Sequence, residues 1–211
     1  MTLEEEFDVI KEFVDEKKGQ FKKPSKNANY KYGEEEHFLS LKKSFINSRK
    51  SKIDINEPKT ITDDALWEYI KLQKNLSQNQ VDEFAKYHKI AMSIETKLGN
   101  LLESFIYKYV KDFNWIWCSG SIIQDIDFIK KETNNDSSVN WIALQVKNSD
   151  NSENAASSRV RVGTDIIKWY RRLSRVKKKD NWQELINLIN ENGEDLKDQL
   201  NEKNYLTYLK S

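Results

Sequence analysis

The sequence has very few of the residues that build disulfide frameworks or zinc sites. Cys118 is its only cysteine, and His37 and His88 are its only histidines among 211 residues. One cysteine excludes an intrachain disulfide and a cysteine-rich metal site. Two histidines far apart in the sequence give zinc catalysis little support. A disulfide scaffold and a zinc hydrolase are therefore poor descriptions of this chain.

Long apolar runs and phosphate-binding glycine loops are also missing. No apolar run approaches the ~20 residues that cross a bilayer, and the acidic start Met1–Glu6 is unlike a signal peptide. Gly120 and Gly163 stand alone, so no P-loop or dinucleotide fingerprint is present. We therefore expect a cytoplasmic protein without a membrane partner or a nucleotide cofactor.

The sequence does have many aromatic residues and an uneven charge. Its 6 Trp, 9 Tyr and 9 Phe and its net charge of +1 predict a folded chain rather than a disordered one. Residues 147–179 carry ten Lys and Arg against three acids, whereas residues 180–211 carry three bases and seven acids. A basic block inside a nearly neutral chain indicates a surface for an acidic partner, although a solvated helix face has the same composition.

Helical periodicity dominates the first part of the sequence. Apolar residues recur at helical spacing over residues 3–14 and 38–46. Thr62-Asp63-Asp64 has the hydroxyl and the acids of a helix start. Ser77-Gln78-Asn79-Gln80 fits a capping box, which predicts a long helix that runs toward Lys111.

The period changes after this helix. Residues 115–130 are rich in β-branched and aromatic residues, with Gly120 as a bend or bulge, and residues 141–147 form a second apolar strand. The polar residues 131–140 between them predict an antiparallel hairpin that belongs to a larger sheet. Two further helices are expected, from Thr164 to Arg175 and from Asn181 to near Gly193.

The order of helices, strands and helices predicts an α/β (α+β) fold, in which helices flank a central mixed β-sheet. Within this fold we expect an N-terminal helical region at residues 1–90 and the core at residues 91–211, together in one compact domain. No internal repeat is evident.

The predicted hairpin carries polar residues in a chemically suggestive pattern: Asp127 on one strand and Gln145-Val146-Lys147 on the other. Residues two apart in a strand share a face, so Gln145 and Lys147 point the same way. A carboxylate, an amide and an ammonium on an apolar strand pair are costly unless they serve each other or a metal. Oxygens of Asp127 and Gln145 suit a hard cation such as Mg²⁺, and Lys147 could activate a water or stabilise a phosphorane.

The same residues also fit an ordinary sheet. Asp125 and Asp127 could form the solvated face of an edge strand, and Gln145 and Lys147 could be simple polar alternation. The pattern leaves open which of the two aspartates is the ligand, because a bulge near Gly120 would change the face that the strand presents.

Asp127-Phe128-Ile129 at the end of one strand and Gln145-Val146-Lys147 on the next resemble the PD-(D/E)XK nuclease superfamily, in its variant with glutamine as the second acidic residue. The resemblance implies a restriction-endonuclease-like core, with Asp127 and Gln145 as metal ligands and Lys147 acting on the attacking water. It also implies a glutamate on a preceding helix. Glu103 fits that place, with Gly99 letting the helix approach the sheet. Two departures are the missing proline before Asp127 and the charge lost at Gln145.

The polar run after Lys147 resembles the recognition segment of type II restriction endonucleases and is most similar to the SinI-like group. Asn can pair bidentately with adenine and Arg with guanine, while Ser, Thr and Lys contact phosphates. The DNA-recognition segment is expected at residues 148–179, with contacts from Asn148, Asp150, Asn151, Ser152, Asn154, Ser157, Arg159, Arg161, Thr164, Lys168, Arg171 and Arg172.

The resemblance implies a prokaryotic type II restriction endonuclease that hydrolyses double-stranded DNA with Mg²⁺. Its catalytic residues would be Asp127, Gln145, Lys147 and Glu103, of which Asp127, Gln145 and Glu103 would bind the metal. Cutting both strands of a symmetric site needs two active sites, so we expect a homodimer. A repair or recombination nuclease of the same fold remains an alternative. So does a non-catalytic DNA-binding protein with a degenerate site, which Gln145 would favour.

Overall fold

The computed structural model describes residues 1–16, 18–50, 63–134, 136–150, 165–174, 179–190 and 194–210. The chain divides into two compact units. The first comprises Met1–Ser51 and Leu101–Ser211, and the second comprises Lys52–Asn100. Among the described residues, no helix combines the length and apolar character needed to cross a membrane.

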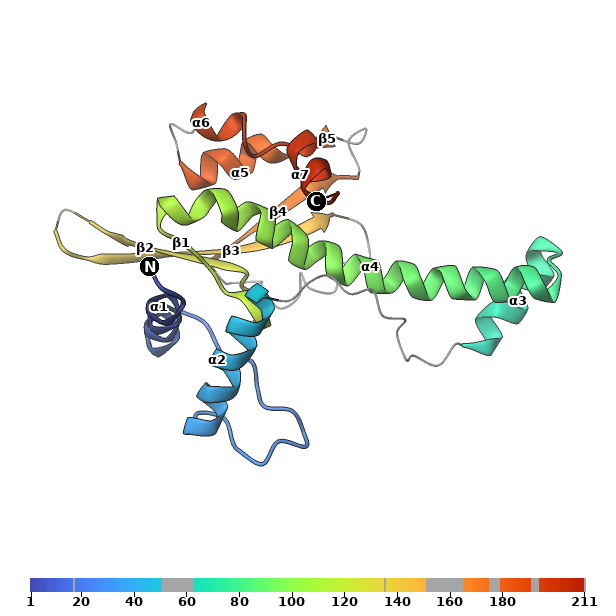
Figure 1. Ribbon diagram of the computed structural model, residues 1–211, viewed down its shortest axis with the longest axis horizontal. Helices are drawn as coiled ribbons and strands as arrows, with labels where there is room; N and C mark the ends of the chain where they lie inside the picture. The colour runs from blue at the N-terminus through green and yellow to red at the C-terminus, as the bar shows by residue number, and fades with distance from the viewer. Residues whose placement is uncertain are drawn as a thin grey trace. The chain divides into compact units, whose positions relative to one another are not determined.

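A five-stranded sheet forms the centre of the first unit (Figure 1). β2 pairs antiparallel with β1 and with β3, β3 pairs parallel with β4, and β4 pairs antiparallel with β5. The predicted hairpin and the predicted mixed sheet are therefore confirmed. In their order across the sheet, the strands are β1 (Trp115–Trp117), β2 (Phe128–Thr133), β3 (Val139–Ser149), β4 (Ile166–Leu173) and β5 (Lys179–Asp180).

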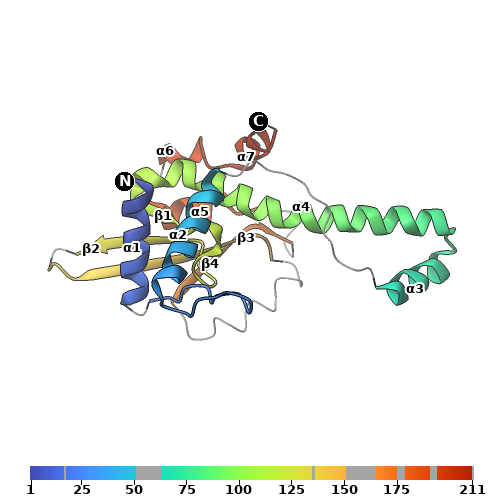
Figure 2. The same cartoon turned by 60° about the horizontal axis from the view of Figure 1, so that its bottom comes forward.

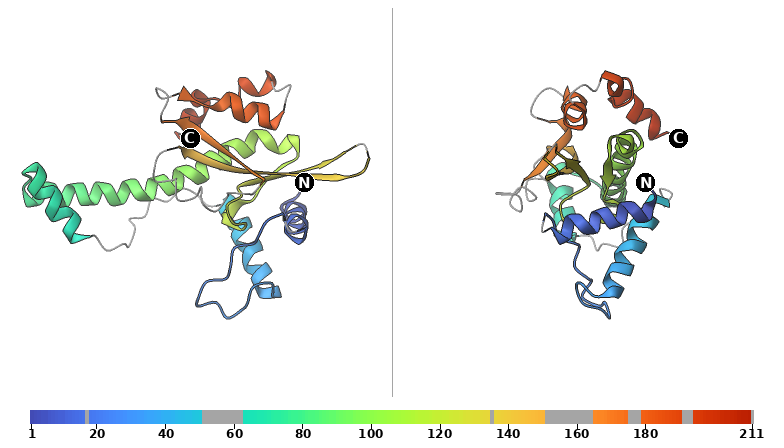
Figure 3. Two further views of the ribbon diagram at one scale, coloured as in Figure 1. Left: turned by 180° about the vertical axis from the view of Figure 1, so that it is seen from behind. Right: turned by 90° about the vertical axis from the view of Figure 1, so that its left-hand side faces the viewer.

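Helices cover both faces of this sheet (Figures 1 and 3). One face carries α1 (Leu3–Asp15) and α2 (Glu35–Lys50), which lie side by side in the turned view (Figure 2). The other face carries the last residues of α4 (Gln78–Val110) and the C-terminal helices. These C-terminal helices are α5 (Trp182–Ile189), α6 (Glu194–Lys197) and α7 (Glu202–Tyr208).

Side chains that alternate along the strands divide the core into two clusters. Ile116 and Ile129 pack with α1 and α2. Trp117, Phe128 and Leu144 pack with α4 and the C-terminal helices. This alternation follows from the period of two in a strand and gives the sheet one apolar layer on each face.

The second unit contains α3 (Asp64–Lys74) and the first part of α4. Asn75 ends α3 in a left-handed conformation with a φ of 52°. Ser77 and Gln80 then bond reciprocally at the start of α4, which confirms the predicted capping box. The rings of Trp67 and His88 meet edge to face at 5.8 Å.

The division of the chain differs from the boundary expected near residue 90. Phe7, Phe13 and Phe45 from α1 and α2 are buried in the same cluster as strand residues. Helical periodicity located these helices, but it carries no information on which surface they cover, so the N-terminal helices could not be assigned to the sheet from sequence.

The helix predicted from Thr164 to Arg175 is wrong, because the described part of this segment is strand β4. Its side chains alternate, and Trp169 is fully buried between β3 and α5 neighbours. Thr164 and Arg175 themselves lie outside the described residues. The charged residues of this segment obscure the alternation of its side chains in the sequence, and the pairing with β3 makes that alternation clear.

The strand expected over residues 115–130 is interrupted. The short helix η2 (Ser119–Ser121) follows β1, and Gly120 has a φ of +77° there, so its predicted role as a bend is confirmed. A Cβ on Gly120 would lie 2.8 Å from the Ser44 carbonyl oxygen of α2, so this position requires glycine.

The bounds of two further segments differ from those expected. The turn between β2 and β3 is shorter than residues 131–140, because β2 continues to Thr133 and β3 begins at Val139. α5 ends at Ile189, before Gly193.

Candidate active site

Asp127 lies at the point where β2 begins and leaves its partner β3. Its N–H donates to the Leu144 carbonyl at 2.9 Å, and its carbonyl accepts from the Cys118 N–H at 2.8 Å. Its Oδ2 accepts from the Val146 N–H at 2.8 Å. Ladder N–H groups point along the sheet, so this carboxylate stands in the plane of the sheet, in the opening between two strands.

Glu103 approaches this opening from α4. Its Oε2 accepts a 2.7 Å hydrogen bond from the Trp117 indole of β1. Burial and then the charge of Asp127 raise the pKa of Glu103 to about 8, against 4.5 for an ordinary glutamate. The Trp117 hydrogen bond and the charge of Lys147 oppose that rise. The charges of Asp127 and Lys147 therefore both act on Glu103.

Gln145 and Lys147 lie on β3 beside Val146, whose N–H binds Asp127. Val146 points into the core with α4. Gln145 and Lys147, its neighbours along the strand, therefore point to the opposite face of the sheet. Gln145 is 3% exposed, and among the described residues its Oε1 has no hydrogen-bond donor. An unsatisfied buried acceptor costs about 1–3 kcal/mol, so this oxygen needs a ligand.

The carboxylates of Asp127 and Glu103 and the orphaned oxygen of Gln145 fit a hard divalent cation. Such ions prefer oxygen ligands. A cation would supply the charge that two neighbouring carboxylates lack and the partner that Gln145 lacks. Across the part of the chain that the structure describes, no three His, Cys, Asp or Glu side chains gather as a metal site. An amide oxygen would therefore have to complete this oxygen-rich set.

Asp125 has a different environment from Asp127. It has a left-handed backbone with a φ of 60°. It lines a hollow of about 960 Å³ on the α1 side of the sheet, together with Trp141 and Asp165. Asp127 is not among the described residues that line this hollow. The geometry therefore favours Asp127 as the partner of Glu103.

The predicted DNA contacts that the structure describes fall on both faces of the sheet. Lys168 pairs in register with Gln145, which places it on the face of Gln145 and Lys147. Its Nζ lies 5.0 Å from the Tyr170 ring centroid. Arg171 points the other way, where it forms a 2.5 Å ion pair with Glu202 of α7.

The other predicted DNA-contact residues that the structure describes form hydrogen bonds or ion pairs within the chain. Asn148 accepts from Arg171 at 3.4 Å, Arg172 pairs with Glu202 at 3.0 Å, and Asp150 accepts from the Ser174 N–H at 2.5 Å. The other predicted contacts lie outside the described residues: Asn151, Ser152, Asn154, Ser157, Arg159, Arg161 and Thr164.

Trp117 is a site residue that the sequence did not reveal. The sequence indicates a core tryptophan, and the 5% exposure of Trp117 confirms that position. Its hydrogen bond to Glu103 joins two elements across a turn, so no spacing rule predicts it. Burial of an indole does require a partner for its N–H, and this is the only signal that the sequence contains.

Comparison with known proteins gives matches along the chain. A family model described as SinI restriction endonuclease matches residues 1–211. The type II restriction enzyme Eco47I of Escherichia coli is 34% identical over 184 residues, which cover 86% of this chain and 77% of that protein. The type II restriction enzyme SinI of Salmonella infantis is 32% identical over 182 residues, with the same two shares.

Proposed function

Because the chain belongs to the SinI restriction endonuclease family, we propose that the residues gathered around the start of β2 are its active site. The protein is a type II restriction endonuclease, a site-specific enzyme that acts on double-stranded DNA with a divalent metal. The repair nuclease and the non-catalytic DNA-binding protein are not favoured. The observation that supports this site most strongly is the buried Glu103, which accepts a hydrogen bond from the Trp117 indole and is influenced by the charges of both Asp127 and Lys147.

Asp127, Gln145 and Glu103 are the proposed metal ligands, and Mg²⁺ is the proposed metal. Asp127 is held in place by the Val146 N–H, and Glu103 by the Trp117 indole. Gln145 presents an oxygen that has no donor among the described residues. When bound, Mg²⁺ supplies Lewis-acid polarisation of the scissile phosphate.

Lys147 is the proposed group that acts on the attacking water. Its side chain shares a strand face with Gln145, and its charge lowers the pKa of Glu103. In hydrolysis, a water oxygen bonds to phosphorus while one P–O ester bond breaks and the leaving oxygen takes up a proton. A cation at this place orients the water and stabilises the negative charge that grows on the phosphate oxygens.

The DNA is proposed to approach the face that carries Lys147 and Lys168. Their shared face follows from the parallel register of β3 and β4, in which Gln145 lies opposite Lys168. Phosphate contacts of such lysines set the position of the duplex, and base contacts set its sequence. The base contacts are proposed to come from the segment 148–179.

A homodimer is the proposed assembly. In the proposed site, one chain supplies one set of Glu103, Asp127, Gln145 and Lys147. The two strands of a duplex run in opposite directions, so two such sets related by a twofold axis can cut both strands of a symmetric sequence.

The test of the site compares three variants in cleavage of plasmid DNA with Mg²⁺. Asp127→Asn and Lys147→Ala should each lower the cleavage rate by ~10²-fold or more, as loss of a transition-state contact does. Asp125→Asn is the matched control, because it neutralises an aspartate two positions away that faces the hollow instead. Undiminished cleavage by Asp127→Asn, or a loss confined to Asp125→Asn, would contradict the proposed site.

A further inference from the structure

We propose that Trp117 is a positioning residue that holds the Glu103 carboxylate toward Asp127, and that Arg49 holds Trp117 in turn. This inference rests on the proposed role of Glu103 as a metal ligand. It adds two residues from outside the expected nuclease motif, one on the edge strand β1 and one on α2.

Trp117 is attached to Glu103 by its only polar side-chain atom. The indole Nε1 donates to Glu103 Oε2 at 2.7 Å, and the ring is buried in the cluster with α4. An indole N–H can only donate, so it bonds the carboxylate in one direction and leaves the other carboxylate oxygen available.

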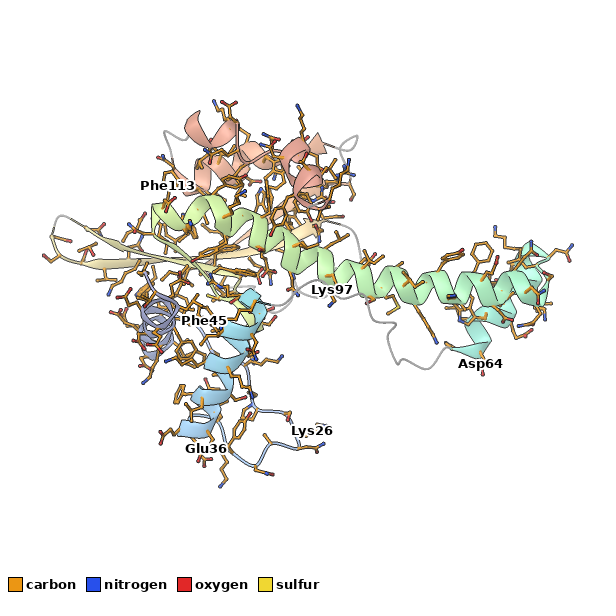
Figure 4. All side chains as sticks on the ribbon, viewed as in Figure 1. Lys26, Glu36, Phe45, Asp64, Lys97 and Phe113 are labelled. Atoms are coloured by element: carbon orange, nitrogen blue, oxygen red, sulfur yellow. The ribbon has the colours of Figure 1, made fainter. Side chains whose placement is uncertain are left out.

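Arg49 fixes Trp117 from two sides. Its guanidinium donates to the Trp117 carbonyl at 2.6 Å, and its Cζ lies 4.8 Å from the Trp117 ring centroid. The same Cζ lies 4.8 Å from the ring of Phe45, which is labelled on α2 in Figure 4, and 4.1 Å from the ring of Tyr107. A planar guanidinium that stacks on a ring and donates a hydrogen bond at the same time is restricted to one orientation. Because Arg49 makes both contacts with Trp117, it restricts the orientation of the Trp117 ring as well.

Glu6 of α1 completes this arrangement. It pairs with Arg49 at 2.7 Å, with side-chain exposures of 5% for Glu6 and 7% for Arg49, and it accepts a short hydrogen bond from the Tyr107 hydroxyl. Tyr107 follows Glu103 by one turn of α4. The buried ion pair therefore joins α1 and α2 to the same helix face that carries Glu103.

The proposed ligand set needs such support. Glu103 and Asp127 repel each other when both are ionised, and a free glutamate would turn away from its neighbour. A fixed donor behind the carboxylate removes that freedom before the metal arrives. Groups that hold metal ligands in this way change metal affinity or activity by ~10–100-fold when they are replaced.

The experiment measures Mg²⁺ binding to the full chain without DNA by calorimetry. Trp117→Phe keeps an aromatic ring and removes the N–H, and we expect it to weaken Mg²⁺ binding by ~10-fold. Trp115→Phe is the matched control. Trp115 lies on the same strand and is also buried, but among the described residues its Nε1 has no acceptor. We expect Trp115→Phe to bind Mg²⁺ as the unmodified protein does.

A double-mutant cycle separates positioning from general damage to the fold. In a Glu103→Ala background, Trp117→Phe should cause no further loss of Mg²⁺ affinity, because its partner is gone. An equal loss in both backgrounds would overturn the proposal, and so would equal losses from Trp115→Phe and Trp117→Phe.

A second measurement needs no variant and covers the case in which Trp117→Phe does not fold. In protein labelled with ¹⁵N-tryptophan, Mg²⁺ should shift the indole N–H resonance of Trp117 and leave that of Trp115 in place. A Trp117 resonance that does not shift on addition of Mg²⁺ would overturn the inference.

The binding measurements also separate failure of this inference from failure of the proposed active site. If Asp127→Asn binds Mg²⁺ as the unmodified protein does, the proposed active site itself fails. If Asp127→Asn weakens binding and Trp117→Phe does not, only the inference fails.

Discussion

At the residue scale, the candidate site holds groups in states that oppose folding when no metal is bound. Glu103 is a buried acid beside a second carboxylate, and Gln145 Oε1 is a buried acceptor that has no donor among the described residues. Both penalties disappear if a divalent cation binds between them. The metal-free protein is therefore less stable at this site, and binding of a cation would restore that stability. Such groups are common at functional sites.

Glu103 makes the stability of the metal-free protein depend on pH. Its pKa is raised to about 8 in the folded chain, against 4.5 for an ordinary glutamate, first by burial and then by the charge of Asp127. Between those values the folded state keeps a proton that the unfolded state releases. The stabilising contribution of this group is therefore complete below pH 4.5 and is lost as the pH rises through 8.

The measurement is urea unfolding with a chelator at pH 5.5 and at pH 8, a window chosen to lie within the titration of Glu103. Glu103→Gln cannot ionise, so its free energy of unfolding should fall less over this window than that of the unmodified protein, by more than ~1 kcal/mol. Parallel pH dependence of the two proteins would show that Glu103 does not hold the proton.

The residues of the site differ in how far they could be predicted from sequence. Asp127, Gln145 and Lys147 stand out because polar groups interrupt apolar strands, and that signal is local. The roles of Asp125 and Asp127 could not be separated, because the left-handed turn at Asp125 sets which way each points. Trp117 remained hidden because its partner lies on a different element.

At the element scale, β4 shows the limit of periodicity. Ile166, Ile167, Trp169 and Tyr170 suit a strand, but the charged residues among them also suit an amphipathic helix. The choice is made by parallel pairing with β3, a contact between segments separated by a polar run. By contrast, the hairpin of β2 and β3 was predictable, because its partners are neighbours in the chain.

Gly120 shows how one residue lets two elements approach each other. It has a φ of +77°, and a Cβ there would lie 2.8 Å from the Ser44 carbonyl oxygen of α2. Gly120→Ala should therefore destabilise the protein by ~1–2 kcal/mol from the left-handed backbone and by a further ~1–3 kcal/mol from the overlap with α2.

The control for Gly120 is Gly33→Ala. Gly33 has a φ of +86°, and a Cβ there meets no described atom within 4 Å, so only the backbone penalty applies. Chemical unfolding of both variants separates the two effects. Equal losses of stability in the two variants would show that η2 and α2 can move apart to accept the Cβ without a measurable loss of stability.

At the scale of the whole molecule, charge and symmetry determine what one chain can do. The net charge of +1 hides a basic block at residues 147–179, which begins at the candidate catalytic lysine. In the proposed arrangement, DNA attracted to this block would meet the face of Lys147 and Lys168. A single copy of the site can nevertheless act on only one strand of the duplex at a time.

The homodimer is tested with mixed dimers, in which one subunit is unmodified and the other carries Asp127→Asn. Each subunit bears a different affinity tag, and the mixed species is purified through both. If each subunit cuts one strand, mixed dimers should convert supercoiled plasmid to the nicked circle, whereas unmodified dimers should produce linear DNA. Sedimentation of the unmodified protein should give twice the 25.0 kDa mass of the chain. A monomer that makes linear DNA, or a mixed dimer that cuts both strands as fast as the unmodified dimer, would contradict the arrangement of one site per strand.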